Sequence, residues 1–142
     1  MSTTQALLQP IQVGDLQLKN RVWMAPMTRS RANNPENKVF DIHAKYYAQR
    51  ASSGLIISEG SQISPRAVGY INTPGIYSEA QTEAWKQVTQ AVHEAGGHIF
   101  IQLWHVGRMS HPDFHGGELP LSASATNPNS KSFTPQGFKD TV

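Results

Sequence analysis

Three apolar runs stand out along a chain of otherwise mixed polarity. They lie near residues 21–27, 54–60 and 98–105, and polar residues gather at their C-terminal ends. Short continuous runs rich in β-branched residues are typical of strands buried on both faces of a parallel sheet. Gln102 breaks the third run near its end, and a buried amide requires hydrogen-bond partners. We therefore expect Gln102 to contact a ligand or, in the simpler alternative, neighbouring backbone.

Helical patterns occupy the two segments between these runs. The first helix is predicted to begin near Asp41, which can cap it, and Gly54 supplies the stop. Its expected apolar face contains Ile42, Tyr46, Ala48 and Ala51.

The second helix has stronger signals. Ser78 and Gln81 form a capping box at its start, and Gly96 supplies its end. Apolar residues recur at helical spacing, which makes Trp85 a packing residue rather than a ligand contact. Strands and helices thus alternate as two βαβ units, which predicts a parallel sheet with right-handed crossovers.

The two ends of the chain carry different patterns. Residues 10–19 alternate apolar and polar positions on either side of Gly14-Asp15, which predicts a two-stranded hairpin. Residues 109–142 are rich in Ser, Pro, Gly and Asn and show no clear period, so they predict a long loop over the strand ends.

The predicted three-stranded sheet needs further strands. Three parallel strands leave open edges, and the hairpin has no core to seal unless further strands exist. A closed eight-stranded α/β barrel needs about 250 residues, whereas this chain has 142. We expect the N-terminal part of a (β/α)8 TIM barrel, a hairpin plus about three βα units, with the remainder of the barrel on another polypeptide chain.

Charge and composition argue against some classes of binding partner. The formal net charge is only +2, without a basic stripe, which argues against binding to nucleic acid or membranes. Cysteine is absent and no apolar run is long enough to span a bilayer, so a cytoplasmic protein is the default. Three histidines near the C-terminus, His105, His111 and His115, suggest a metal-dependent hydrolase as an alternative. Their spacing matches no known zinc signature, so we expect no metal.

Four motifs in order resemble the N-terminal part of the Old Yellow Enzyme family, FMN-dependent ene-reductases on a (β/α)8 barrel whose N-terminal hairpin plugs the barrel bottom. They are Ala25-Pro26-Met27-Thr28-Arg29-Ser30-Arg31, Gly54-Leu55-Ile56-Ile57-Ser58-Glu59, Gly69-Tyr70 and Gln102-Leu103-Trp104-His105-Val106-Gly107-Arg108. The resemblance covers nearly the whole chain but only about the first two fifths of a family barrel.

The resemblance implies a flavin site. Pro26, Met27 and Thr28 would face the isoalloxazine ring, with the Thr28 hydroxyl near the flavin C4 carbonyl, where a donor tunes reduction. Gly60 would let the flavin approach the backbone, and Gln102 would pair with the pyrimidine edge of the ring. The simpler alternative for Thr28 is a strand-end residue that caps its own backbone.

The resemblance also implies a substrate pocket and a reaction. Tyr70 and Trp104 would line the pocket above the flavin, although either could be a core aromatic. The completed enzyme would use NADPH or NADH to reduce activated alkenes such as enones, nitroalkenes and maleimides. The substrate-binding His/Asn pair, the proton-donating Tyr and the phosphate-binding loops of the family come from later strands, so this chain alone should bind FMN weakly and catalyse nothing. The main alternative is a non-catalytic binding fragment.

Overall fold

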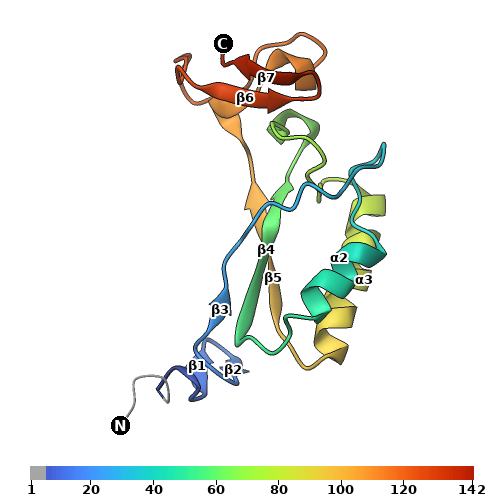
Figure 1. Cartoon of the computed structure of the whole chain (residues 1–142), viewed down its shortest axis with the longest axis vertical. Coiled ribbons are helices and arrows are strands. Elements are labelled where there is room, and N and C mark those ends of the chain that lie inside the picture. The colour runs from blue at the N-terminus through green and yellow to red at the C-terminus, as the bar shows by residue number, and fades with distance from the viewer. Residues whose placement is uncertain (1–5) are drawn as a thin grey trace.

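A three-stranded parallel sheet forms the centre of the computed structural model, which describes residues 6–142 (Figure 1). Strand β4 (Leu55–Gln62) lies between β3 (Trp23–Met24) and β5 (Ile99–Trp104) and pairs in parallel with both. The predicted parallel sheet is confirmed. Strand β3 is shorter than the apolar run that predicted it because Pro26, just beyond it, has no N–H to donate to a ladder.

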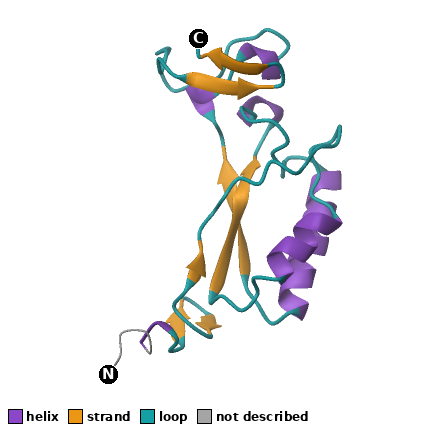
Figure 2. Ribbon diagram, viewed as in Figure 1, coloured by secondary structure: helices purple, strands orange, loops and turns teal. Residues whose placement is uncertain are grey.

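Helices α2 (Asp41–Ala48) and α3 (Glu79–Glu94) cover one face of this sheet (Figure 2). The apolar core lies between the two layers and consists of Val39, Tyr47, Ala51, Ile56, Trp85, Val88, Val92 and Ile99. Trp85 is buried as predicted and donates its indole N–H to the Gly75 carbonyl at 3.1 Å. None of the helices within residues 6–142 is both long and apolar enough to cross a membrane.

The capping box of α3 is confirmed. The Ser78 hydroxyl accepts the Gln81 N–H at 3.2 Å, and the Gln81 side-chain oxygen accepts the Ser78 N–H at 3.1 Å. The Gln81 amide also donates to the Glu36 carbonyl at 2.8 Å, so it ties the helix start to the loop before α2. Gly96, with a φ of +74°, follows the helix end as predicted.

The predicted cap, end and buried face of α2 need correction, whereas the helix begins at Asp41 as predicted. Asp41 is the first helical residue rather than the cap, because Phe40 precedes it and donates its N–H to Nδ1 of His43 at 3.2 Å. This bond turns the imidazole inward, so His43 and Tyr47, one turn apart, form the buried face, and Ile42 is 49% exposed. Gly54 lies well beyond the helix end, and it is glycine because a Cβ there would lie 2.0 Å from the Asn20 carbonyl oxygen.

The N-terminal hairpin is confirmed. Strands β1 (Ile11–Val13) and β2 (Leu16–Leu18) pair antiparallel around Gly14, whose φ is +55°. The hairpin lies near the start of β4, at the opposite end of the molecule from the C-terminus (Figure 1). Lys19 fixes it there by donating to the carbonyl oxygens of Ala51 and Gly96, which follow the two helices.

The long loop predicted for residues 109–142 is wrong in part, because the segment contains an antiparallel hairpin. Strand β6 (Lys131–Thr134) pairs with β7 (Gly137–Asp140) beyond the C-terminal ends of β4 and β5 (Figure 1). The hairpin buries Ser132 and Thr134, while Phe133 stacks on Phe138 at 4.7 Å on its exposed side. This arrangement inverts the usual alternation, so hydrophobicity gave no signal. Single-turn 3-10 helices complete the chain at Pro65–Ala67, Gly107–Met109 and Pro112–Phe114.

We predict that Gln81→Ala lowers the free energy of unfolding by about 3 kcal/mol, because it leaves several backbone groups without partners. The control is Gln87→Ala, the same change at an exposed position of the same helix, which should stay within about 0.5 kcal/mol of the parent. Urea unfolding followed by circular dichroism measures both values. Equal losses for the two variants would contradict the role given to the Gln81 amide.

Candidate functional site at the strand ends

The predicted site residues meet at one edge of the sheet. Parallel strands place their C-terminal ends together, and Pro26, Met27 and Thr28 follow β3 directly. Gly60 of β4 and Gln102 of β5 are partners in the ladder. The structure thus brings together five residues from three segments that are distant in sequence.

The polar side chains at this edge are accessible. Thr28 and Gln102 are exposed, Met27 is 45% exposed, and neither the Thr28 hydroxyl nor the Gln102 amide makes a hydrogen bond within residues 6–142. Thr28 therefore does not cap its own backbone. A hydroxyl and an amide together offer donors and an acceptor, a set that fits the carbonyl and ring-nitrogen edge of a flavin lying across the strand ends.

The expected burial of β5 on both faces is corrected. Phe100 and Leu103 are 52% and 68% exposed, and Gln102 is exposed as well. Strand β5 is an edge strand of the three-stranded sheet, and the helices cover only the face that carries Ile99 and Ile101. Gln102 is consequently a free polar group rather than a buried one satisfied by backbone.

Gly60 has a structural reason to be glycine that the sequence did not reveal. A Cβ at this position would lie 2.5 Å from Cε3 of Trp104, so the indole ring occupies the space that a side chain would fill. The close approach of a flavin to this backbone stays a prediction, and the close approach of the indole is a second reason for glycine at this position. Gly60 thereby helps to set where the Trp104 ring lies.

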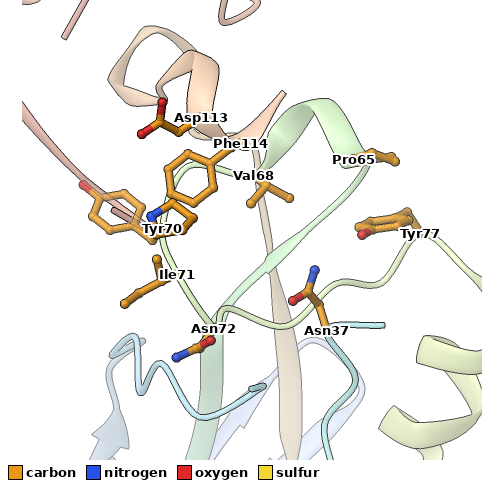
Figure 3. A pocket seen from close by; sticks show the side chains of 10 residues that line it. Asn37, Pro65, Val68, Tyr70, Ile71, Asn72, Tyr77, Asp113 and Phe114 are labelled. Carbon is orange, nitrogen blue, oxygen red and sulfur yellow. The ribbon is translucent and has the colours of Figure 1, made fainter. Parts of the chain in front are cut away.

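Tyr70 and Trp104 form an aromatic pair. Their rings stack with a centroid separation of 5.3 Å and an interplanar angle of 24°, and both residues are half-buried. Tyr70 also lines a hollow of about 640 Å³ with Asn72, Tyr77, Asp113 and Phe114 (Figure 3). The hollow lies between the loop that follows β4 and the C-terminal segment. Trp104 and the strand-end residues do not line it, so only Tyr70 connects the two regions.

Sequence reasoning missed Glu59, a buried carboxylate directly behind the strand ends. Its side chain is fully buried, and its Oε2 accepts the backbone N–H of Arg29 at 3.0 Å. Its Oε1 accepts the hydroxyl of Tyr47 at 3.3 Å, and the Tyr47 oxygen in turn accepts the Glu59 N–H at 2.8 Å. The available signal was a charged residue inside an apolar strand run, which is rarely buried without partners.

The protonation of this cluster follows from burial. Burial raises the pKa of Glu59, and the hydrogen bonds from Arg29 and Tyr47 offset part of that rise. Burial also raises the pKa of Tyr47, so its hydroxyl stays protonated, and lowers the pKa of His43, whose imidazole is neutral. Because the folded state holds the Glu59 proton more tightly than the unfolded chain, this residue's contribution to stability falls as pH rises from its ordinary pKa through the raised one.

The three C-terminal histidines do not gather around a common point. Within residues 6–142, no group of His, Cys, Asp and Glu side chains has an arrangement that could hold a metal ion. Nε2 of His115 lies 2.9 Å from the Ser110 hydroxyl, which also donates to the Val68 carbonyl at 2.5 Å. Ser110 is buried, so this pair joins two loops and presents no accessible nucleophile.

Comparison with known proteins decides the family. Residues 6–136 match the family described as NADH:flavin oxidoreductase / NADH oxidase. The chain belongs to this family. FMN and NAD(P)H are the family's cofactors, in agreement with the donor set at the strand ends.

Individual relatives support the same assignment. The chain is 48% identical to chanoclavine-I aldehyde reductase of Penicillium roqueforti, over 95% of this chain and 38% of the relative. It is also 48% identical to 12-oxophytodienoate reductase 1 of rice (Oryza sativa subsp. japonica), over 83% of this chain and 31% of the relative.

Solved structures show how much of the fold is present. An Old Yellow Enzyme homologue from Zymomonas mobilis superposes with a TM-score of 0.91 at 47% identity, over 96% of this chain and 38% of that protein. Morphinone reductase in complex with tetrahydroNAD superposes with a TM-score of 0.88 at 44% identity, over 96% of this chain and 39% of that protein. This flavin oxidoreductase chain therefore has the fold of the N-terminal part of the barrel, as expected, and spans about two fifths of the length of these relatives.

We predict that Gly60→Ala displaces the Trp104 ring and lowers the free energy of unfolding by about 2 kcal/mol, because an added methyl overpacks the contact. In a Trp104→Leu background the same substitution should cost much less. A double-mutant cycle of urea unfolding energies measures this coupling, and a crystal structure of Gly60→Ala locates the ring. Additive energies together with an unmoved indole would refute the contact.

Proposed function

We propose that this chain is the N-terminal part of an FMN-dependent ene-reductase, which uses NADPH or NADH to reduce activated carbon–carbon double bonds in enones, nitroalkenes or maleimides. The observation that supports it best is that Thr28, just after β3, and Gln102, on β5, both expose their polar side chains at the strand ends. The chain that carries them belongs to a flavin oxidoreductase family.

In this proposal each residue at the strand ends has a separate task. Bound FMN supplies hydride acceptance from the nicotinamide and hydride delivery to the alkene. The Thr28 hydroxyl donates to the flavin C4 carbonyl and stabilises negative charge there. The Gln102 amide bonds the pyrimidine edge and orients the ring, while the backbone of Pro26 and Met27 lies against it.

The stacked pair of Tyr70 and Trp104 would shape the substrate pocket. Two aromatic rings in contact hold each other in place, so they present a fixed wall rather than a movable one. The direction from which an alkene can lie over the flavin then depends on this wall, and Gly60 helps to set it through its contact with Trp104.

The proposed activity needs the remaining barrel strands. The aligned relatives are more than twice as long as the matched region. Strand β5 lies at the edge of the sheet, and its residues Phe100 and Leu103 leave apolar surface exposed. We propose that a complementary barrel segment covers this surface and supplies the groups that bind the flavin phosphate and the substrate carbonyl.

Complementation tests the proposal. This chain, combined with the part of the Zymomonas mobilis enzyme that lies beyond the matched region, should bind FMN, turn yellow and oxidise NADPH when cyclohexenone is added. Without the second segment the chain should remain almost colourless with FMN. A folded but flavin-free complex would favour a non-catalytic binding fragment instead.

We predict that Thr28→Val in the completed barrel lowers the rate of flavin reduction by NADPH roughly 10-fold to 100-fold, because a hydrogen bond to developing charge is worth about 1.5–3 kcal/mol. The matched control is Thr28→Ser, which retains the hydroxyl and should stay close to the parent rate. Stopped-flow absorbance of the flavin measures both variants. Equal rates for Val and Ser would show that the hydroxyl does not contact the flavin.

A further inference from the structure

Glu59 is a buried ionisable group beside the candidate site that the proposed mechanism does not use. Its carboxylate faces the helix layer, because Tyr47 and His43 of α2 both lie against it. Its Oε1 lies 4.0 Å from Nε2 of His43, which has no hydrogen-bond partner within residues 6–142. Because Nδ1 of His43 accepts the Phe40 N–H, the imidazole proton sits on Nε2 and points a third donor toward the carboxylate.

A break in the strand register gives Glu59 this direction. Ile57 opposes Phe100, but Gly60 opposes Gln102, so β4 contains one extra residue between these two pairs. In a regular strand, residues three apart lie on opposite faces. Here Ile56 belongs to the core beneath the helices, and Glu59 also bonds to α2. The irregularity therefore turns the carboxylate to the back of the sheet while Gly60 stays opposite Gln102.

The Glu59 carboxylate is the tether, meaning the hydrogen-bond anchor, of the segment from Met27 to Arg31 that follows β3. Among the backbone N–H groups from Met27 to Arg31, only that of Arg29 has a partner within the described residues, and that partner is Glu59. The next bonded N–H, that of Ala32, donates to the Asn72 carbonyl at 2.9 Å. Ser30, next to the tether, has a φ of +51°, a left-handed conformation that a non-glycine residue adopts only under constraint.

We propose that Glu59 is a positioning residue for the flavin: by holding the Arg29 N–H, it fixes the backbone from which the Thr28 hydroxyl reaches the cofactor. This inference rests on the proposed function and deepens it. Glu59 does not touch the reacting atoms, since its own side chain is fully buried on the helix side of the sheet. The Tyr47 hydroxyl holds the carboxylate in turn and His43 lies beside it, so α2 helps to determine where Thr28 lies.

The test compares the effect of Thr28→Val with and without the tether. In the completed barrel loaded with FMN, Thr28→Val should shift the flavin reduction potential to lower values, because a donor to the reduced flavin is lost. In a Glu59→Leu background most of that shift should disappear, because the hydroxyl is no longer held in place. Glu83→Leu, the same change at an exposed position of α3, should leave the full shift intact.

Two further variants keep the inference testable if Glu59→Leu does not fold. Tyr47→Phe removes the hydroxyl that donates to Oε1 and accepts the Glu59 N–H, so it should reduce the Thr28 shift in part. Glu59→Gln can keep one acceptor for the Arg29 N–H and should retain most of the shift. A full Thr28 shift in Glu59→Leu, or in Tyr47→Phe if the Leu variant is not recovered, overturns the positioning role. If the parent barrel binds no FMN, the proposed function fails first, so the two failures are distinguishable.

Discussion

Parallel pairing of β4 with both of its neighbours is the constraint on which the rest of the structure depends. It places three strand ends at one edge and forces the crossover helices onto a face of the sheet. Helices α2 and α3 then bury the side chains of that face, while Phe100 and Leu103 on β5 remain exposed. The edge with the accessible hydroxyl and amide is therefore a consequence of topology.

Local signals predicted the elements that are stabilised locally. The Gly14 hairpin and the Ser78–Gln81 capping box formed as expected because their turn and cap residues act over only a few positions. Prediction failed where tertiary contacts reverse the usual pattern. The face of α2 follows the His43 bond rather than hydrophobicity, and the β6–β7 hairpin buries hydroxyls and exposes phenylalanines. No periodicity argument from sequence alone reveals either arrangement.

The candidate site shows the same division between features that the sequence predicts and features that tertiary contacts determine. A resemblance in motifs pointed to Thr28, Gly60 and Gln102, and the fold brings these positions to one edge. It did not point to Glu59, because the carboxylate turns to the helix side only through the register shift in β4. The contact between Gly60 and Trp104 was equally hidden, since it depends on where a ring from the neighbouring strand lies. Both relations are properties of strand pairing and have no signature in either strand by itself.

The accessible and buried polar groups at the strand ends complement each other. Thr28 and Gln102 are free to bond a ligand, but free side chains on a loose backbone would lose affinity and rate, because small displacements weaken directed hydrogen bonds. The buried carboxylate behind them has its donors in place and therefore needs no ligand to become ordered. Rigidity thus comes from the helix side of the sheet, while the accessible polar groups lie at the strand ends. In the proposed flavin site, this separation would keep the strand-end side chains in place before a cofactor binds, because their backbone is held from the opposite side of the sheet.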